Sequence, residues 1–322
     1  MKRRTFLATA SAAAAFAASP LLAQGRTARI VVGFAAGGPG DLLARVAADH
    51  MKPRWAPAVV VDNKPGGGGR LSIETTKTAD PDGLTLLNTP ASILTIQPHA
   101  YKTMPFDPFA DLVPVAALAE LDFAIVAGPM APVKTLAEYV DLARKDPKLA
   151  TYGTAGAGTP QHLIGFKLGQ VAGVTFTHAA YRGGAPALQD TMAGQIPMTV
   201  GAVSGAMIQA HNEGKARILA TTGTRRSAFL TDIPTAEEAG FKGVVATDWS
   251  GLYAPPKTPA AALEQAGQAV AEMVKDPAYR DAVAKLNMVP MVLDAKGCAA
   301  RLRQEFDYWG PAVKATGFTL EG

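Results

Sequence analysis

Three glycine-rich segments each follow an expected β-strand, at residues 35–40, 63–69 and 154–159. In open parallel sheets, ligands collect at the carboxyl ends of the strands, where the N-termini of the following helices point. Free backbone N–H groups and the positive end of a helix dipole favour an anion there, and glycine lets an oxyanion approach the backbone closely. One such segment alone is better explained as a tight turn. Three together predict an anion-binding site.

The motifs of common enzyme classes are missing. In Gly201-Ala202-Val203-Ser204-Gly205 the serine stands one position late for a GxSxG nucleophile elbow. The chain has no GxxxxGK[ST] phosphate loop, and neither 38–40 nor 156–158 carries the third glycine of a dinucleotide-binding GxGxxG. The sequence therefore predicts no catalytic residues and no cofactor.

Metal sites are not predicted either. The single cysteine, Cys298, excludes an intrachain disulfide and a cysteine-based zinc cluster. The histidines show no HExxH or paired metal-ligand spacing; they are His50, His99, His162, His178 and His211. We interpret four of them as structural or exposed. His162 lies one turn into the helix that follows residues 154–159, so it could contact a ligand or, equally well, orient the loop.

Short apolar runs alternate with amphipathic helices along the chain, which predicts an α/β fold with a parallel sheet covered on both faces. We expect a helix with Asp41 as its N-cap after the first segment, and Pro160 at the first position of the helix after the third. A capping box, Thr135 with Glu138, begins another helix. Strands are expected at 28–34, 58–62, 84–88, 113–118, 123–127, 150–153, 174–178, 198–201, 218–222 and 249–254. About 300 residues of this pattern favour two lobes over one sheet.

Residues 1–23 are typical of a secretory signal: basic residues, then an alanine-rich apolar stretch and a small-residue end. The apolar stretch is shorter than the roughly 20 residues that a membrane span requires. Arg3-Arg4-Thr5-Phe6-Leu7 is similar to the twin-arginine export signal, which leaves two export routes open. We expect the mature chain to be exported, and the resemblance described below implies that it lies in the periplasm. Removing Lys2, Arg3 and Arg4 leaves 28 basic against 27 acidic residues, too little excess charge to predict a nucleic-acid partner.

Six segments, in the same order along the chain, resemble the Bug-type extracytoplasmic solute receptors of the tripartite tricarboxylate transporter system. They are 32–45 (VGFAAGGPGDLLAR), 59–69 (VVVDNKPGGGG), 152–163 (YGTAGAGTPQHL), 181–194 (YRGGAPALQDTMAG), 219–240 and 249–259 (WSGLYAPPKTP). The chain departs from the family pattern at Asp62, Gly67 and Gly40. Glutamate, alanine and a hydroxyl residue, respectively, are common at these three places.

The resemblance implies a two-lobed periplasmic-binding-protein fold of type II-like architecture, with two crossing hinge strands near 119–122 and 247–249. It places residues 24–121 and 248–322 in lobe 1 and residues 122–247 in lobe 2. Such receptors close their lobes over the ligand by a hinge motion.

The resemblance also implies that two loops hold a carboxylate, largely through backbone N–H groups and water. Carried onto this sequence, the ligand-binding residues are Phe34, Ala36, Gly37, Gly38 and Asp41 in the first loop and Thr154, Gly158, Thr159 and His162 in the second. Thr89, Ala202 and Asp248 are added because they end strands that should face the ligand. Asp41 could equally cap its helix and do nothing more. Arg182 could meet a second carboxylate, although a surface position explains it better.

Three functions fit the sequence. A solute receptor would deliver a small carboxylate to membrane permease subunits, a sensing receptor would signal to a two-component partner, and an exported α/β enzyme would turn its ligand over. No nucleophile–base pair supports the enzyme, and neighbouring genes would separate the first two. Because no acidic pair is available to hold an amino group, mono- or dicarboxylates are favoured over amino acids. No large apolar interface is evident, so we expect a monomer.

Overall fold

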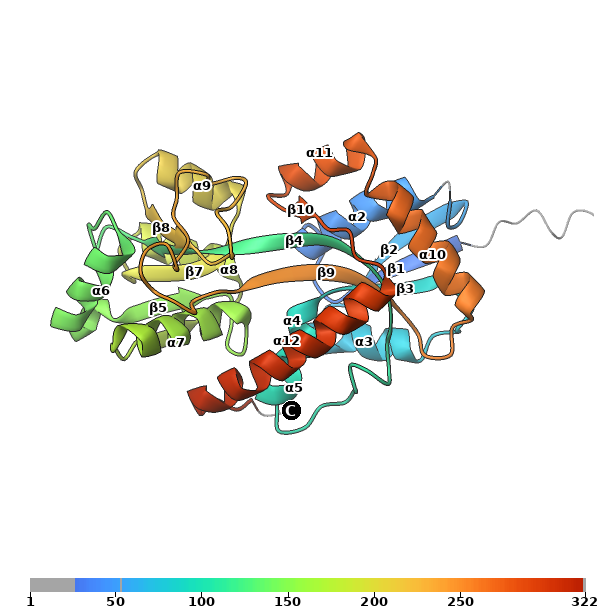
Figure 1. The fold of residues 1–322 in the computed structure, drawn as a ribbon, viewed down its shortest axis with the longest axis horizontal. Coiled ribbons are helices and arrows are strands. Elements are labelled where there is room, and N and C mark those ends of the chain that lie inside the picture. The colour runs from blue at the N-terminus through green and yellow to red at the C-terminus, as the bar shows by residue number, and fades with distance from the viewer. Residues whose placement is uncertain (1–26, 53, 321–322) are drawn as a thin grey trace, which may run out of the picture.

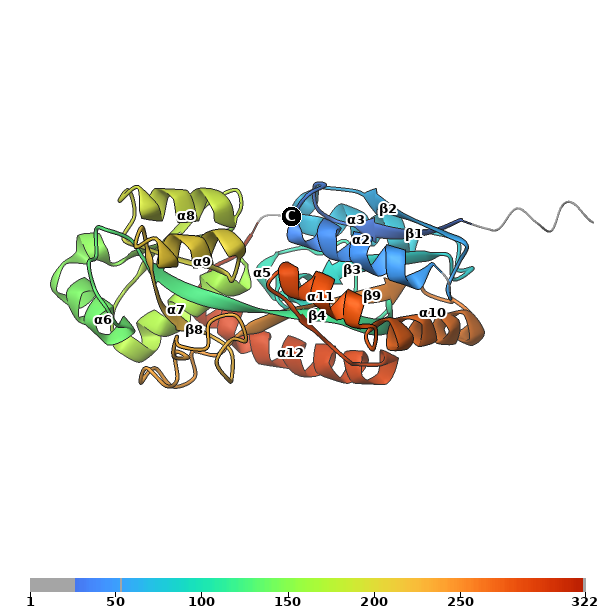
Figure 2. The ribbon, with the colours of Figure 1, turned by 90° about the horizontal axis from the view of Figure 1, so that it is seen from above.

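The computed structural model describes residues 27–52 and 54–320 as two lobes joined by two long strands (Figures 1 and 2). These strands, β4 (Val113–Ala127) and β9 (Thr247–Ala254), run antiparallel through the middle of the molecule. The expected export signal, residues 1–23, lies outside the described residues.

The sheet of the first lobe has the order β2–β1–β3–β9–β4. β1 (Thr27–Val32) pairs in parallel with β2 (Ala58–Asn63) and β3 (Thr85–Pro90), whereas β9 is antiparallel to both of its neighbours. The expected parallel pairing is present among β1, β2 and β3 but not at β9. The reason is the crossing itself: β4 carries the chain out of the lobe and β9 brings it back, so the two strands run in opposite directions.

β4 also begins the sheet of the second lobe. Its residues up to Asp122 pair with β9, and those from Phe123 onward pair with β7 (Met198–Ala202) and β8 (Arg217–Thr221). β5 (Thr151–Thr154) then pairs in parallel with β7 and with β6 (Thr177–Ala180). Two separate strands were expected over 113–127, because Glu120 and Asp122 interrupt the apolar run. The backbone stays extended because one partner strand takes over where the other ends.

Helices cover both sheets. The first lobe has α2 (Pro39–Met51), α3 (Arg70–Lys77), the short α4 (Ala91–Thr95) and α5 (Gln97–Ala100), α10 (Ala260–Met273) and α11 (Pro277–Lys285). The second has α6 (Leu136–Lys145), α7 (Pro160–Ala172), α8 (Gly184–Met192) and α9 (Gly205–Asn212). Short 3-10 turns occur at Gly67–Gly69 (η1) and Pro147–Leu149 (η2), and β10 (Val289–Pro290) pairs with β4. The sequence did not predict α4 and α5.

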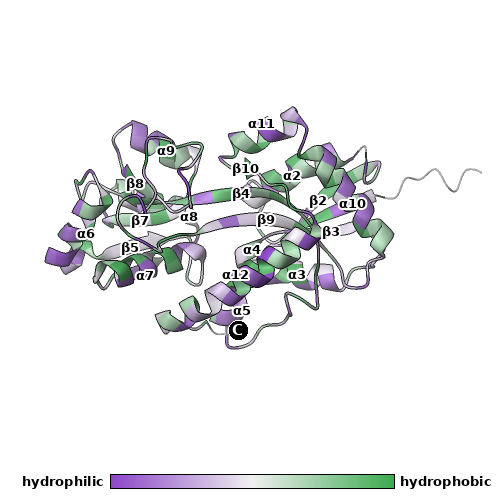
Figure 3. Ribbon diagram, in the orientation of Figure 1, coloured by the Kyte–Doolittle hydropathy of each residue, from purple (hydrophilic) through white to green (hydrophobic). Residues whose placement is uncertain are grey.

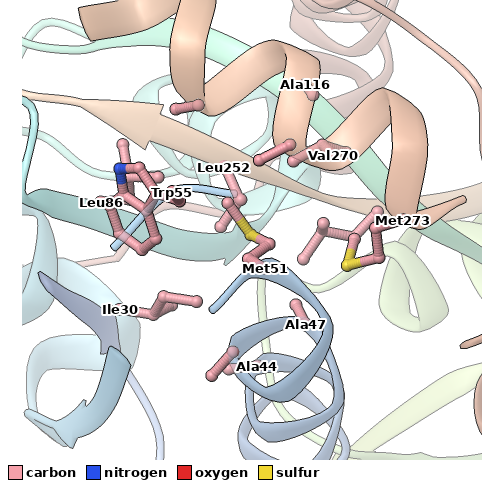
Figure 4. Packing of buried hydrophobic residues seen from close by; sticks show 14 of the residues in the cluster. Ile30, Ala44, Ala47, Met51, Trp55, Leu86, Ala116, Leu252, Val270 and Met273 are labelled. Carbon is pink, nitrogen blue, oxygen red and sulfur yellow. The ribbon is translucent and has the colours of Figure 1, made fainter. Parts of the chain in front are cut away.

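The core of the first lobe fixes the position of α2. Met51 of α2 and Met273 of α10 pack against Ile30, Leu86 and Leu252 of the sheet (Figure 4). All five side chains are fully buried. Each contributes on the order of 1.5–3 kcal/mol relative to exposure. This packing fixes α2 on the sheet, and the N-terminus of α2 follows shortly after the carboxyl end of β1.

The long C-terminal helix α12 (Ala295–Thr316) contacts both lobes (Figures 1 and 2). Near its start, Cys298 and Leu302 pack with first-lobe residues. Near its end, Trp309 and Val313 belong to an apolar cluster built mainly from the second lobe. The sequence-based division, which assigns all of 248–322 to lobe 1, stays a prediction.

Candidate ligand-binding site

The first predicted loop joins β1 to α2 and is held by Asp41. The Asp41 carboxylate, 1% exposed, accepts hydrogen bonds from the Gly37 amide (2.9 Å), from Arg45 Nε and Nη2 (2.9 Å each) and from Asn63 Nδ2 (3.0 Å). Burial opposes ionisation, but the hydrogen bonds from Arg45, Gly37 and Asn63 hold the pKa of Asp41 below its usual value. Gly37, at φ +83°, makes the turn that brings its amide to this carboxylate.

Asp41 is not the N-cap of α2, which corrects the sequence interpretation. The N-cap is Gly38, and Pro39 takes the first helical position, where its missing N–H is not needed. Asp41 instead lies in the first turn and reaches back to the loop. These hydrogen bonds shape the loop.

The second glycine-rich segment, residues 63–69, packs directly on the first. A β-carbon at Gly33 would lie 2.8 Å from the Gly69 α-carbon, so only glycine allows this approach. The ring of Phe34 is 38% exposed and borders the same place, with Cζ 3.7 Å from a β-carbon placed on Gly69. Two of the three predicted loops therefore form one surface, which continues into α3.

The third segment lies in the second lobe, between β5 and α7. Thr159 is the N-cap of α7, and its Oγ1 accepts from the His162 amide (3.4 Å) and donates to the Gly156 carbonyl (2.8 Å). Gly158 donates its amide proton to His162 Nδ1 at 3.2 Å. Pro160 occupies the first helical position, as the sequence predicted. The ring of His162 thus orients the loop, and contact between His162 and a ligand stays a prediction.

His178 lies against this segment and has structural contacts, in line with its interpretation as one of four structural or exposed histidines. Its ring stacks on that of His162 with centroids 4.0 Å apart, and its Nε2 lies 2.7 Å from Thr154 Oγ1. Burial, with the nearby His162, lowers the pKa of His178 to about 4, and burial also lowers that of His162. Both rings are therefore neutral at pH 7 and offer dipoles rather than charge. Parallel pairing of β5 with β6 brings Tyr152 opposite His178. This pairing was not predicted from the sequence.

Both loops border the same short helical segment, α4–α5. Ile93 of α4 lies against Gly69, where an added β-carbon would come 2.7 Å from its Cδ1. Ala100 of α5 lies against Gly158, with a corresponding distance of 3.6 Å. The glycine-rich segment 63–69 of the first lobe and the loop 154–159 of the second lobe thus contact the consecutive helices α4 and α5.

The remaining candidates lie nearer to the crossing strands. Thr89 is buried in β3 opposite Gly251 of β9, and its Oγ1 has no hydrogen-bond partner. Ala202 ends β7 opposite Phe123. Arg182, which follows β6, is exposed.

Two cavities lie away from the loops. One of about 490 Å³ lies between β4, α10 and the start of α12, and one of about 440 Å³ lies between α7 and the end of α12. Within residues 27–52 and 54–320, no three or more His, Cys, Asp or Glu side chains are grouped so that they could hold a metal ion. Over the same residues, no helix has the length and apolar character to span a membrane.

A family model of the tripartite tricarboxylate transporter family receptor matches residues 43–318. The chain belongs to this family. A relative from Cupriavidus necator, the UPF0065 protein in the gbd 5' region, is 35% identical over 306 residues, covering 92% of each chain. Members of this family are substrate-binding receptors, so this receptor is not an enzyme.

Solved structures agree with this assignment. The periplasmic binding protein BugD is 28% identical with a TM-score of 0.79, over 92% of this receptor and 99% of BugD. Rpa4515 of R. palustris, solved with adipate, is 26% identical with a TM-score of 0.82, over 91% and 98% of the two chains. The Bug-type resemblance and the two-lobed fold with two crossing strands are thereby confirmed.

A charged network joins both crossing strands of the receptor to α12. Arg301 of α12 donates to Glu120 of β4 and to Glu305, each at 2.7 Å, and Thr247 of β9 donates to Glu120 at 3.0 Å. Trp249 Nε1 donates to both Glu305 oxygens at 3.0 and 3.1 Å. Figure 3 shows the hydrophilic stretches that interrupt β4 and β9 where they cross. Burial raises the pKa of Glu305, whereas the hydrogen bond and charge of Arg301 lower it. Arg301 therefore stabilises the ionised form of Glu305.

Asp248 lies beside this network and binds the start of α4. Its Oδ2 accepts from Ser92 Oγ at 2.6 Å, and its Oδ1 accepts from the amides of Ser92 (3.2 Å) and Trp249 (2.9 Å). Burial, helped by the charge of Glu305, raises the pKa of Asp248 to about 7. Asp248 thus joins a hinge strand to α4, and a direct contact with ligand stays a prediction.

Asp248→Asn should change how the stability of the receptor depends on pH. Between about pH 4 and pH 7 native Asp248 binds a proton that the unfolded chain has released, so its contribution to stability falls as the pH rises. Asparagine keeps the hydrogen-bond pattern of the protonated acid, with Nδ2 donating to Ser92 Oγ. From pH 5 to pH 8, the free energy of unfolding of the variant minus that of the wild type should increase by about 2–4 kcal/mol. Urea unfolding of both proteins across this pH range measures the difference. The titration of His162 and His178 affects both proteins equally and cancels. A difference that does not change with pH would contradict the prediction.

Proposed function

We propose that this receptor binds a small carboxylate in the periplasm and delivers it to the permease subunits of a tripartite tricarboxylate-type transporter. The observation that carries the proposal is the pair of glycine-rich loops, one in each lobe, each leading into the N-terminus of a 13-residue helix, α2 or α7. Backbone N–H groups and the helix dipole at each N-terminus favour an anion. The adipate held by Rpa4515 is a carboxylate of the same class.

The ligand would lie between the two loops. The Asp41 carboxylate and the Gly37 amide are engaged with each other, so they shape the loop. The proposed contacts are Phe34, Ala36, Gly38, Gly158, Thr159 and His162, with Gly37, Asp41, Thr89, Thr154, Ala202 and Asp248 supporting them. Neutral His162 and His178 would donate or accept hydrogen bonds without adding charge.

A thermal-shift screen of residues 24–322 against carboxylic acids tests the proposal. An acid present at 100 times its dissociation constant adds about 2.7 kcal/mol of stability. We expect at least one acid to raise the melting temperature and its amide or alcohol analogue to have no effect. If no acid shifts the melt, or if the acid is consumed, the carboxylate-receptor proposal is wrong.

Two matched threonine variants locate the site. Thr159→Val removes the N-cap of α7 at the proposed site, and Thr135→Val removes the N-cap of α6, whose predicted capping box with Glu138 is present. Each loss costs about 1 kcal/mol of stability. We expect only Thr159→Val to abolish the acid-induced shift. Equal shifts in both variants would place the ligand elsewhere.

Delivery to a permease needs its own test. Membrane vesicles containing a tripartite tricarboxylate-type permease should accumulate the radiolabelled acid only when the loaded receptor is added. Gel filtration of the same receptor should give a monomer. Accumulation without the receptor would contradict the delivery role while leaving ligand binding intact.

A further inference from the structure

Arg70 has a guanidinium that the protein leaves unpaired. It is the first residue of α3, directly after η1. Its Nη1 is buried without a hydrogen-bond partner, and no ion pair to Arg70 occurs within the described ranges 27–52 and 54–320. A buried unsatisfied donor destabilises the folded chain, and such groups are rare in native proteins. An anionic group brought by a ligand would supply the missing acceptor.

The guanidinium is held in place by Tyr101. Arg70 Cζ lies 4.0 Å from the centroid of the Tyr101 ring, a cation–π contact. The Tyr101 amide donates to Gln97 O at 3.0 Å, and the adjoining Ala100 carbonyl accepts from the Leu320 amide at 2.7 Å. The backbone at Tyr101 is therefore held by hydrogen bonds on both sides. A side chain that is already ordered loses less conformational entropy when a ligand binds.

The chain neighbours of Arg70 and of Tyr101 contact the two proposed carboxylate-binding loops. Gly69, which precedes Arg70, packs against Phe34 of the first loop. Ala100, which precedes Tyr101, packs against Gly158 of the second-lobe loop. Next to the same turn, Gln97 Nε2 donates to the Gly68 carbonyl at 3.0 Å, while Gln97 Oε1 is buried and unpaired. A cationic donor on α3 and an unpaired acceptor on α5 thus flank the turn at Gly68.

We propose that Arg70 binds the second carboxylate of the ligand, so that this receptor selects dicarboxylates over monocarboxylates. The inference rests on the proposed function, in which the two loops hold the first carboxylate. An arginine fork suits a carboxylate because two parallel N–H groups meet its two oxygens. Arg182 was another candidate for this role, but that residue is exposed, whereas Nη1 of Arg70 is buried and unpaired.

Titration calorimetry with acids of equal chain length tests the selection: adipate against hexanoate, glutarate against pentanoate, and succinate against butyrate. We expect the wild type to bind the best dicarboxylate about 10- to 100-fold more tightly than its monocarboxylate. Arg70→Met should remove that ratio and leave monocarboxylate affinity within about threefold. Arg70→Lys, which keeps the charge but not the fork, should retain part of the ratio. Arg182→Met is the matched control and should retain all of it.

The outcomes separate the two proposals. If the wild type binds no acid at all, the proposed function fails. If it binds monocarboxylates as tightly as dicarboxylates, or if Arg70→Met lowers the melting temperature but keeps the ratio, the role of Arg70 fails and the receptor function stands. Loss of the ratio in Arg182→Met instead would also overturn the assignment to Arg70.

Discussion

Gly165→Ala is expected to destabilise the receptor by about 3 kcal/mol and to weaken ligand binding. Gly165 lies inside α7, where a β-carbon would lie 2.5 Å from Cδ2 of Tyr152 and closer still to Cε2 and Cζ. The Tyr152 ring cannot move aside easily: it is 1% exposed and packs against Phe176 and His178. Its hydroxyl also donates to the His162 carbonyl at 2.8 Å. The substitution therefore strains the helix that begins at the proposed site.

Gly267→Ala is the matched control for this variant. Gly267 lies inside α10, and a β-carbon there would meet Val115 O at an ordinary 3.8 Å. Alanine is preferred to glycine in a helix interior by about 1 kcal/mol, so this variant should be as stable as the wild type or slightly more stable. Urea unfolding and the dissociation constant of the best acid measure both effects. If Gly165→Ala behaves like Gly267→Ala, α7 does not pack on Tyr152 as described.

Arg301→Met is expected to lower the stability of the receptor by about 3 kcal/mol at pH 8. It leaves Glu120 and Glu305, whose side chains are 26% and 21% exposed, without their shared cation. Removing one partner of a largely buried ion pair is costly because the other charge remains desolvated. Because burial already raises the pKa of Glu305, protonation relieves this cost, and the loss should shrink toward pH 5.

Arg303→Met, two positions along the same helix, provides the comparison. Arg303 is exposed and its Cζ lies 3.5 Å from the centroid of the Phe109 ring, so its loss should cost at most about 1 kcal/mol at either pH. The double variant Arg301→Met with Glu305→Gln should recover part of the stability at pH 8. Urea unfolding at pH 5 and pH 8 measures all of these. A loss for Arg301→Met that does not depend on pH would argue against uncompensated carboxylates as its cause.

Some of the site could be predicted because its signals are local. Thr159 as N-cap and Pro160 at the first helical position follow from the order of neighbouring residues, and both are present. The contacts of His178 and Arg70 could not be predicted, because neither carries a local signal. His178 acquires its role by strand pairing with β5, and Arg70 by the packing of Tyr101 from another helix.

By itself the sequence determined the alternation of strands, glycine-rich turns and helices, and the family resemblance. These depend on hydrophobic periodicity and on residues adjacent in the chain. Only the tertiary structure decided which polar groups are already occupied by the protein. Asp41 is satisfied by Asn63, 22 positions away, and Asp248 by Ser92, 156 positions away. Such partners are chosen by the packing of distant elements, because a buried charge is stable only where the folded chain brings donors to it.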